Sequence, residues 1–515
     1  MVALAKRKTD EFQAFYTSCN HITGYMVGLL EFDSEMSILE PCAGDGAFID
    51  ELLSQNYKSS ITAFEIDSKS VGNLINKYRT ASNVHIQQAD FAFLELEPIF
   101  DRVIANPPYG AYQTPEKRAR LKSTYPDIYA KETYGIFLVR AMELLKPNGR
   151  LVFIVPDTFL TLHMHEGLRN KILSEYKIES IALFPSKYFP GVNFGYAGLS
   201  IISIKKARVS NEWCFPIYKG LSSPEELEAL LTPKKESFVA GRLSYGKLKT
   251  NPSLSFYLSD ESRVQTLLDQ DLPTVDTICH VVTGFYSGND AHYLRRANSV
   301  IRGAKKYAPV DANLICDINH QLNPPLEGIV GKNHWVPIVK GGNRRFHKPS
   351  EWFMDWSKAS VHDYKVINKK KARFQNSRFY FSQGIAVPMV SSSSITGALI
   401  DGRLFDQSIV GIFPKEGMQH LLMYLLGFFN SRICNQLIRT INASTNNSSN
   451  YIKKIPIVIP EQCQLDEVSA IVFKLYDLAK NREIGESDLS EMNGYFDQIF
   501  GIKTHNPAVH TDAAR

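Results

Sequence analysis

Two hydrophobic patterns alternate along the chain between about residues 15 and 205. Short apolar runs of strand length are followed by longer stretches in which apolar residues recur at helical spacing. Strands and helices that alternate at this spacing predict a doubly wound, mostly parallel α/β sheet. The predicted strands are 37–41, 61–64, 84–86, 100–105, 151–155, 181–184 and 199–204. One predicted helix begins after residue 46, a second ends at about residue 78, and a third covers about 134–145.

The pattern changes after this region. Residues 207–245 are charged, interrupted by proline, and show no clear strand alternation. We therefore predict a domain boundary near residue 244, with an N-terminal domain of residues 1–243 and a C-terminal domain of residues 244–515. Short strands and loops predict a mixed α/β or β-rich C-terminal domain, and residues 464–500 are expected to form helices that pack against it.

Composition limits the classes of protein to consider. The chain has 515 residues, 44% hydrophobic and 22% charged, which is enough for a large core and at least two domains. The longest apolar run, 421–429, is too short to span a bilayer, and the start lacks an apolar stretch of signal-peptide length. Seven cysteines without a Cys-x-x-Cys pair indicate neither zinc nor a disulfide framework, and no metal is assigned to His163 or His165. We expect a cytoplasmic protein. Its net charge of +5 is small, so affinity for nucleic acid would need local basic clusters.

The tetrapeptide Asn106-Pro107-Pro108-Tyr109 directly follows the apolar run 100–105. It therefore places a rigid corner at the carboxyl end of a sheet strand, where open α/β folds bind ligands. The prolines fix φ and remove two N–H donors. What remains is a fixed set of acceptors, the Asn106 side-chain oxygen and the proline carbonyls, beside the aromatic ring of Tyr109.

These acceptors suit an amino group that is a poor nucleophile, such as the exocyclic amine of adenine. Acceptors that hold both N–H bonds would stabilise the positive charge that develops on the nitrogen during attack. Tyr109 would stack on a base taken out of its duplex. The alternative is a proline-rich turn with no catalytic role. The full tetrapeptide supports this alternative less than Asn-Pro-Pro alone would.

Residues at the ends of the other predicted strands suit a nucleoside ligand. The glycines of Ala43-Gly44-Asp45-Gly46 allow a ligand to approach the backbone at a helix start, although Ile49 leaves the dinucleotide fingerprint incomplete. Glu65 is placed as the acid that binds ribose hydroxyls in such folds. Asp90-Phe91 is placed to accept from an adenine amino group and to stack on its ring. As alternatives, Asp45 caps a helix and Phe91 is a core residue.

Together these motifs resemble the gamma class of S-adenosylmethionine-dependent adenine-N6 DNA methyltransferases of restriction–modification systems. The resemblance covers roughly residues 10–205, beginning with Phe15-Tyr16-Thr17. It implies a class I methyltransferase-like fold, S-adenosylmethionine as cofactor, double-stranded DNA as substrate and direct transfer to a flipped adenine. It is also compatible with a cognate restriction endonuclease that acts separately. The residues that it implies are Asn106, Pro107, Tyr109 and Phe189 for catalysis, and Thr17, Glu40, Cys42, Ala43, Gly44, Glu65, Ile66, Asp90, Phe91 and Asn106 for the cofactor.

Two basic stretches of the C-terminal domain, 340–348 and 365–378, contain no acidic residue. Basic residues interleaved with Gly, Asn and aromatic residues suit phosphate and base-edge contacts, and a solvated loop is the alternative. Segments 283–289 and 442–450 are predicted loops that resemble parts of target-recognition domains. The candidate DNA-binding residues are Lys340, Arg344, Arg345, Lys348, Lys370 and Arg373.

Three other functions are compatible with parts of this sequence. A protein-glutamine methyltransferase would hold an amide nitrogen at the same tetrapeptide, but it would not need a C-terminal domain of this size with basic clusters. A catalytically inactive DNA-binding scaffold is disfavoured by the intact Asn106 and Glu65. A nuclease-like pattern is present in Pro156-Asp157 and Glu175-Tyr176-Lys177, but these residues are expected to have structural roles in the sheet domain.

Overall fold

The structure is a computed structural model of the chain. It describes residues 19–501 except 111–112, 189–197, 252, 260, 298–303, 317, 319–324, 343, 392–393 and 443–444. The chain forms two compact units that divide between residues 260 and 261, called here the first and the second unit. Within the described ranges, no helix has the length and apolar character needed to cross a bilayer.

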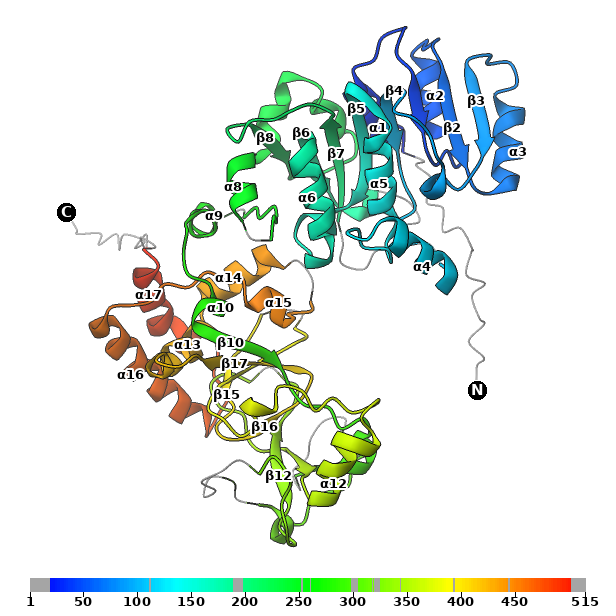
Figure 1. Ribbon diagram of the computed structural model, residues 1–515. Helices are drawn as coiled ribbons and strands as arrows, with labels where there is room; N and C mark the ends of the chain where they lie inside the picture. Colours follow the sequence, from blue (N-terminus) through cyan, green and yellow to red (C-terminus); the bar gives the residue numbers. More distant parts are fainter. Residues whose placement is uncertain are drawn as a thin grey trace, which may run out of the picture. The chain divides into compact units, whose positions relative to one another are not determined.

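The first unit is built on a nine-stranded sheet (Figure 1). Its strands are β1 (Ile38–Glu40), β2 (Ile61–Glu65), β3 (Val84–Gln88), β4 (Phe100–Ala105), β5 (Leu145–Pro156), β6 (Lys177–Phe184), β7 (Leu199–Lys205), β8 (Cys214–Tyr218) and β9 (Val239–Ser244). They lie in the order β3-β2-β1-β4-β5-β7-β6-β8-β9. The first five strands are parallel, whereas β7 is antiparallel to both of its neighbours. The predicted class I methyltransferase-like sheet is therefore confirmed.

The central strands are buried because they are nearly continuous apolar runs, as expected for parallel strands covered on both faces. The helices of this unit are α1 (Asn20–Leu30), α2 (Ala47–Ser54), α3 (Ser68–Lys77), α4 (Pro115–Thr124), α5 (Thr133–Glu143), α6 (Glu166–Glu175), α7 (Glu226–Ala229) and α8 (Tyr245–Thr250). Helix α4, which the hydrophobic pattern did not predict, begins with a capping Thr114 followed by Pro115. Only Leu121 of α4 is buried, so the sequence of this helix lacks the apolar stripe from which a helix can be predicted.

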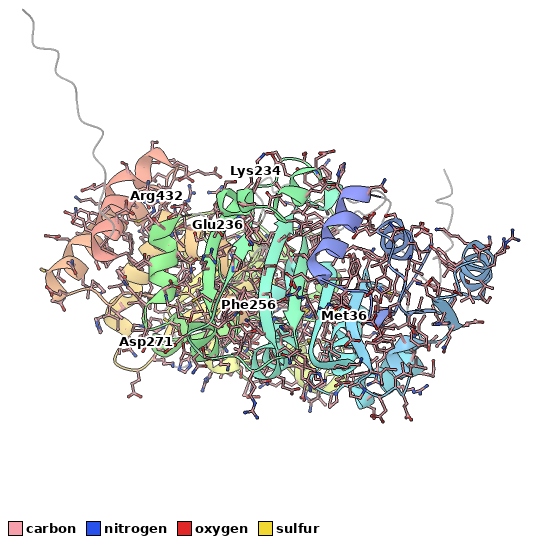
Figure 2. All side chains as sticks on the ribbon, turned by 90° about the horizontal axis from the view of Figure 1, so that it is seen from above. Met36, Lys234, Glu236, Phe256, Asp271 and Arg432 are labelled. Atoms are coloured by element: carbon pink, nitrogen blue, oxygen red, sulfur yellow. The ribbon has the colours of Figure 1, made fainter. Side chains whose placement is uncertain are left out.

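Two corrections concern the end of the first unit. Residues 207–245 do contain strands, because β8 pairs with β6 and β9 closes the edge of the sheet. The boundary also lies later than residue 244. The Tyr245 hydroxyl contacts the backbone of Tyr176 and Ile178. Phe256, which is labelled in Figure 2, is buried and packs against Phe159. These contacts keep α8 and the segment after it within the first unit.

The second unit is mixed α/β, as predicted. Its two four-stranded sheets have the orders β10-β17-β14-β15 and β11-β13-β12-β16. The strands are β10 (Cys279–Thr283), β11 (Leu294–Arg296), β12 (Trp335–Val339), β13 (Trp352–Asp355), β14 (Ile385–Pro388), β15 (Ala398–Leu399), β16 (Leu404–Phe405) and β17 (Ile409–Pro414). The helices are α9 (Ser262–Asp269), α10 (Val275–Ile278), α11 (Asp290–Tyr293), α12 (Lys358–His362), α13 (Leu422–Phe428), α14 (Arg432–Ile441), α15 (Ser449–Ile452), α16 (Gln462–Ala479) and α17 (Ser490–Ile499).

Aromatic side chains form much of the core of the second unit. The buried Trp356 packs against Phe285, Phe374 and Tyr380, with ring centroids 5.4–6.1 Å apart. The predicted C-terminal helices are present as α16 and α17 and pack on this unit, where the ring of Phe428 stacks against Phe500. Phe285 lies in the predicted loop 283–289, so this loop is anchored through the core.

Candidate active site

The loop between β1 and α2 is held in a shape that requires glycine. Ala43 N donates to the Phe64 carbonyl of β2 at 2.9 Å, which joins the loop to the neighbouring strand. Gly46 has φ +84°, and a Cβ there would lie 2.2 Å from the Tyr78 hydroxyl. That hydroxyl in turn lies 2.8 Å from the Gly46 carbonyl oxygen. The side chain of Tyr78 therefore fixes the loop in an open, left-handed conformation.

Two acidic side chains face the glycine-rich loop. The Glu65 carboxylate, at the end of β2, accepts backbone N–H groups from Gly44, Ile66 and Asp67 at 2.8–2.9 Å. Glu40 is 2% exposed, and its Oε2 has no hydrogen-bond partner among the described residues. Burial, with the charges of Asp45 and Glu65 adding to it, raises the pKa of Glu40 well above its usual value. A buried oxygen without a partner fits a ligand that supplies a donor.

Asp90 and Phe91 follow β3 but differ in exposure. Asp90 is partly exposed and pairs with Lys117 of α4 at 2.7 Å. A cavity of about 550 Å³ adjoins it. Phe91 is 1% exposed and packs against Phe64 and Phe137. The Phe91 ring therefore belongs to the core in this structure, and its stacking on the cofactor adenine stays a prediction. The cavity is lined by Ala89, Asp90, Phe93, Leu94, Glu116, Lys117 and Arg120.

The corner after β4 meets the glycine-rich loop, as the strand ends predicted. The Cys42 thiol donates to the Asn106 carbonyl at 3.3 Å. The Tyr109 hydroxyl donates to Asn106 Oδ1 at 2.7 Å, and the Tyr109 side chain is buried at 4% exposure. Burial raises the pKa of the Tyr109 hydroxyl well above its ordinary value, so the group stays a neutral donor. Pro107 is also buried, whereas Ile66 remains partly exposed.

A buried network behind the corner was not predicted from the sequence. Thr133 Oγ1 donates to the Pro108 carbonyl at 2.6 Å. The Tyr109 ring meets Tyr134 edge-on, and the Tyr134 hydroxyl lies 2.9 Å from His165 Nε2. Glu132 Oε2 lies 3.1 Å from the same nitrogen. No sequence motif links these positions, because α5 and the turn before α6 come together only in the fold.

The nuclease-like residues do not come together. Asp157 follows the carboxyl end of β5, whereas Lys177 begins β6, which runs in the same direction. The two side chains therefore lie at opposite ends of strands that run in the same direction. The Lys177 Nζ lies 3.5 Å from the centre of the Trp213 ring, and Glu175 pairs with Lys171. The structural roles expected for these residues agree with this arrangement.

Comparison with known proteins shows which enzymes the chain resembles. Residues 25–189 match the family described as Eco57I restriction-modification methylase. The chain is accordingly a methyltransferase of the restriction–modification type that uses S-adenosylmethionine, as the strand-end motifs predict. Thr17 and Phe189, also expected in its site, lie outside the described residues.

Relatives of this methylase differ in how much of it they cover. The Type II methyltransferase M.HindII of Haemophilus influenzae is 24% identical over 81% of this chain and 83% of its own length. M.HincII of Haemophilus influenzae is 32% identical over 35% of each chain. The adenine-specific methyltransferase BrxX of Escherichia coli is 22% identical over 74% of this chain and 30% of its own. The structure of a DrdV–DNA complex shares the fold, with TM-score 0.52 and 13% identity over 91% of this chain and 57% of that one.

Two of the basic residues expected to bind DNA already have bonding partners within the second unit of the methylase. Lys340 Nζ pairs with Asp290 and Asp406, each at 2.9 Å. Lys348 is 5% exposed, and its Nζ donates to the Lys340 carbonyl at 2.5 Å. Burial lowers the pKa of Lys348 to about 8. Both lysines already have partners within the unit, and their contact with DNA stays a prediction.

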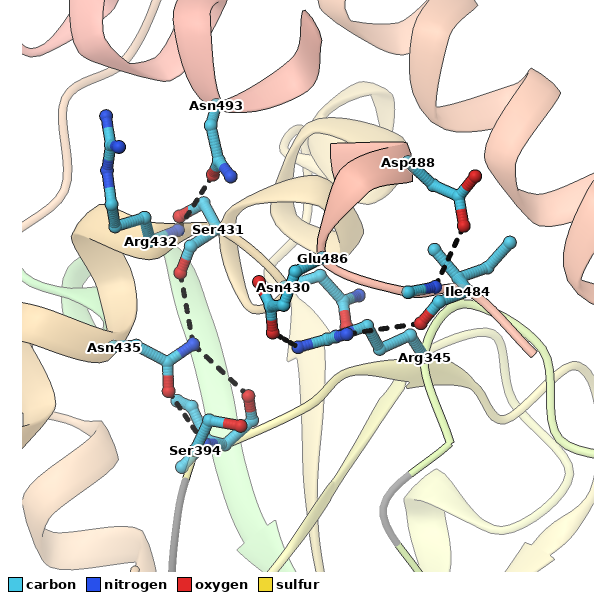
Figure 3. Close-up of polar contacts among 12 residues, drawn as sticks. Arg345, Ser394, Asn430, Ser431, Arg432, Asn435, Ile484, Glu486, Asp488 and Asn493 are labelled. Carbon is cyan, nitrogen blue, oxygen red and sulfur yellow. Dashed lines mark hydrogen bonds and ion pairs between the residues drawn. The ribbon is translucent and has the colours of Figure 1, made fainter. Parts of the chain in front are cut away.

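The arginines of the same stretch contact the segment before α17. Arg345 donates to the Ile484 carbonyl at 3.1 Å and pairs with Glu486 (Figure 3). Arg344 lies 3.6 Å from Glu483 and is about two-fifths exposed. Arg345 is therefore a structural residue in this fold, whereas Arg344 keeps a surface position.

The second basic stretch forms a surface turn. Its exposed cations include Lys370 and Arg373. Arg373 N donates to the Tyr286 carbonyl at 2.8 Å, and a Cβ on Gly288 would lie 2.8 Å from Ala372 N. The fold thus joins the two segments 283–289 and 365–378, which the sequence shows only as separate loops.

Proposed function

We propose that this methyltransferase transfers a methyl group from S-adenosylmethionine to the N6 amino group of a flipped adenine in duplex DNA. The position of Asn106 carries the proposal. It stands at the carboxyl end of β4 and touches the glycine-rich loop through Cys42. Two of the named relatives, M.HindII and BrxX, are a Type II and an adenine-specific methyltransferase.

The residues around the glycine-rich loop fit S-adenosylmethionine. When bound, this cofactor supplies an electrophilic methyl group. The open loop at Gly44 and Gly46 lets it approach the backbone, and the unpartnered Oε2 of Glu40 is available to a donor on it. Glu65 is proposed to accept ribose hydroxyls from the position in which it now holds Gly44. Asp90 is proposed to accept from the adenine amino group beside Lys117.

The Asn-Pro-Pro corner is proposed to activate the target nitrogen. Asn106 Oδ1 and the Pro107 carbonyl would each accept an N–H of the adenine amino group, which favours a tetrahedral nitrogen and stabilises its growing positive charge. The Tyr109 hydroxyl orients the Asn106 amide by donating to it. No side chain needs to act as a nucleophile, because the amino nitrogen attacks the methyl group directly.

Stacking on the flipped base remains a prediction for Tyr109 and Phe189. A flipped base loses a few kcal/mol of pairing and stacking, and aromatic contacts offset about 1–3 kcal/mol of this. In this structure the Tyr109 ring is buried against Tyr134. Stacking would need one face of the ring to become accessible to the base when the adenine enters.

The second unit is proposed to select the DNA sequence. Lys370, Arg373 and Arg344 keep surface positions from which they can reach DNA, whereas Lys340, Arg345 and Lys348 are bound inside the unit or to its own segments. Methylation would protect host DNA from a restriction endonuclease acting separately.

Product analysis tests the proposal. The full chain is incubated with methyl-labelled S-adenosylmethionine and unmethylated duplex DNA, and the digested nucleosides are identified. We expect label in N6-methyladenine. Label in a methylated cytosine, or in added protein rather than DNA, would contradict the assignment and favour another methyl acceptor.

Asn106→Ala tests whether Asn106 acts in the transfer step rather than in cofactor binding. Loss of one preorganised acceptor costs about 3–4 kcal/mol in the barrier, so transfer should fall by at least about a hundredfold. Calorimetry should show cofactor affinity within about threefold of the unmodified protein, a difference of under 1 kcal/mol. A variant that keeps most of its transfer rate would remove Asn106 from the reaction.

A further inference from the structure

Val366 and Ile367 are neighbouring aliphatic residues that both face solvent. They are 59% and 68% exposed. Within the described part of the chain, they are the one pair of large exposed hydrophobic residues that are adjacent in sequence. Single exposed apolar residues are common on protein surfaces, but neighbouring ones form a patch that suggests a contact.

The pair stands on an anchored turn rather than on a loose loop. It ends the π-helical turn Asp363–Ile367 after α12, a rare geometry that is frequent at functional sites. Tyr364 is 1% exposed and donates its hydroxyl to the Asp355 carbonyl at 2.7 Å. Lys365 Nζ donates to the Leu326 carbonyl at 2.9 Å. The residues just before the pair are therefore fixed to the core.

The chain after the pair is also fixed. Ala372 is buried, and its N–H donates to the Asn368 carbonyl at 2.8 Å. Tyr286 and Gly288 hold the same turn from the neighbouring loop through Arg373 and Ala372. The two aliphatic side chains are thus presented outward by a turn that is supported on both sides.

The surroundings of the pair are strongly basic. Exposed cations follow it at once, and no Asp or Glu occurs between residues 364 and 400. The nearest acids along the supporting segments already have partners: Asp363 accepts from the Tyr293 hydroxyl, and Glu327 pairs with Lys365. The cations are Lys369, Lys370, Lys371, Arg373 and Arg378.

We propose that Val366 and Ile367 form an apolar wedge that inserts between stacked base pairs of the bound duplex. Lys369, Lys370 and Arg373 then contact the phosphates beside the opened step. The inference rests on the proposed action on duplex DNA. Duplex DNA is the occupant that fits, because an aliphatic pair followed by a run of exposed cations suits a polyanion whose interior is apolar. Proteins that kink DNA combine aliphatic wedges with basic residues in the same way.

The test compares matched pairs of substitutions in the full chain. The wedge variant carries Val366→Ser and Ile367→Ser. The control carries Ile459→Ser and Phe473→Ser, which are exposed apolar residues of the same unit at 46% and 54%. The probe is a short duplex that contains the sequence methylated by the unmodified protein. Affinity should fall at least about tenfold for the wedge variant and less than about twofold for the control.

Salt dependence and base stacking separate the wedge from the phosphate contacts. The wedge variant should keep the slope of log affinity against log salt, whereas Lys370→Gln or Arg373→Gln should each lower it by about one. In the complex with the unmodified protein, 2-aminopurine is substituted at one position of the duplex at a time. Its fluorescence should rise at a second position besides the target adenine. The wedge variant should lose only that second signal.

Several results would overturn the wedge. Unchanged affinity together with an unchanged 2-aminopurine profile would mean that the pair contacts something other than DNA, such as a protein partner. If the serine variant melts early, Val366→Thr with Ile367→Thr keeps the branching at Cβ and is judged by the same two measurements. An unmodified protein that methylates no DNA would refute the proposed function itself, whereas normal methylation and binding by the wedge variant would refute the wedge alone.

Discussion

Thr133 shows how one side chain outside the motif can support the proposed catalytic corner. Its hydroxyl donates to the Pro108 carbonyl at 2.6 Å, and Thr133 itself is 5% exposed. A hydrogen bond of this kind contributes about 0.5–1.5 kcal/mol. The motif therefore depends on a contact from the first turn of α5.

Thr133→Val should slow transfer about two- to tenfold through that lost bond. Valine keeps the volume and removes only the donor. Cofactor affinity should stay unchanged, since Thr133 touches the corner and not the glycine-rich loop. Single-turnover rates on duplex DNA check this, with Thr133→Ser as the control that keeps the hydroxyl. Equal rates for the valine and serine variants would show that the contact does not position the corner.

Asp157 gives a pH dependence with a definite sign. Burial raises the pKa of its carboxyl to about 6 in the folded protein. The folded state therefore favours the protonated form, and the ionised form destabilises the protein above pH 6. This penalty shrinks as the pH falls and is absent below about 4, where the carboxyl is protonated in both states.

Asp157→Asn should therefore stabilise the protein by about 1–3 kcal/mol at pH 8 and by almost nothing at pH 4. The amide cannot ionise, so the penalty does not arise. Urea unfolding of both proteins at pH 4, 6 and 8 measures the difference. A gain of the same size at all three values would mean that the effect comes from packing and not from ionisation.

At the scale of elements, the link between the glycine-rich loop and α3 can be tested with two glycines. Gly46 lies in the left-handed region, and a Cβ there would strike the Tyr78 hydroxyl. Gly72 lies inside α3 with nothing within 4 Å of an added Cβ. The two positions belong to the same packed region, but an added Cβ would clash at Gly46 and would have free space at Gly72.

Gly46→Ala should destabilise the first unit by about 2 kcal/mol or more and weaken S-adenosylmethionine binding. Gly72→Ala should instead stabilise it by about 0.5–1 kcal/mol, because alanine favours the helix. Thermal melts and calorimetric titration with the cofactor give both quantities. Normal cofactor affinity in a folded Gly46→Ala protein would separate the loop from the cofactor site.

At the scale of the whole molecule, each compact unit has a hydrophobic core of its own. The core of the first unit runs from Ile22 to Phe256, and an aromatic core around Trp356 belongs to the second. The proposed cofactor residues all belong to the first unit, whereas the basic turn at 365–378 belongs to the second. Cofactor binding and DNA selection should therefore be separable.

A fragment of residues 1–260 should fold and bind S-adenosylmethionine with an affinity within about fivefold of the full chain, a difference of about 1 kcal/mol. Its methyl transfer to duplex DNA should fall by at least about a hundredfold, because the basic contacts of the second unit are missing. Circular dichroism and calorimetry test the first part, and labelled transfer tests the second. A fragment that methylates the same sites at the full rate would place target selection in the first unit.

The sequence by itself determined the parallel strands of the sheet and the position of the strand-end motifs, although it missed β8 and β9. The parallel strands are continuous apolar runs, and their carboxyl ends meet at one edge of the sheet. The segment 106–109 therefore had to lie near the glycine-rich loop and Glu65. Local rules were sufficient here, because the period of the hydrophobic pattern and the alternation of strands with helices can be read from neighbouring residues.

Only the tertiary structure decided which of the candidate side chains are accessible. Lys340 is paired with Asp290 and Asp406, which are 50 and 66 residues away along the chain, so its basic neighbours gave a false impression of a free surface. Phe91 and Tyr109 are likewise turned into the core by residues from other elements. Burial and ion pairing depend on contacts between distant segments, and a local pattern of residue types carries no information about them.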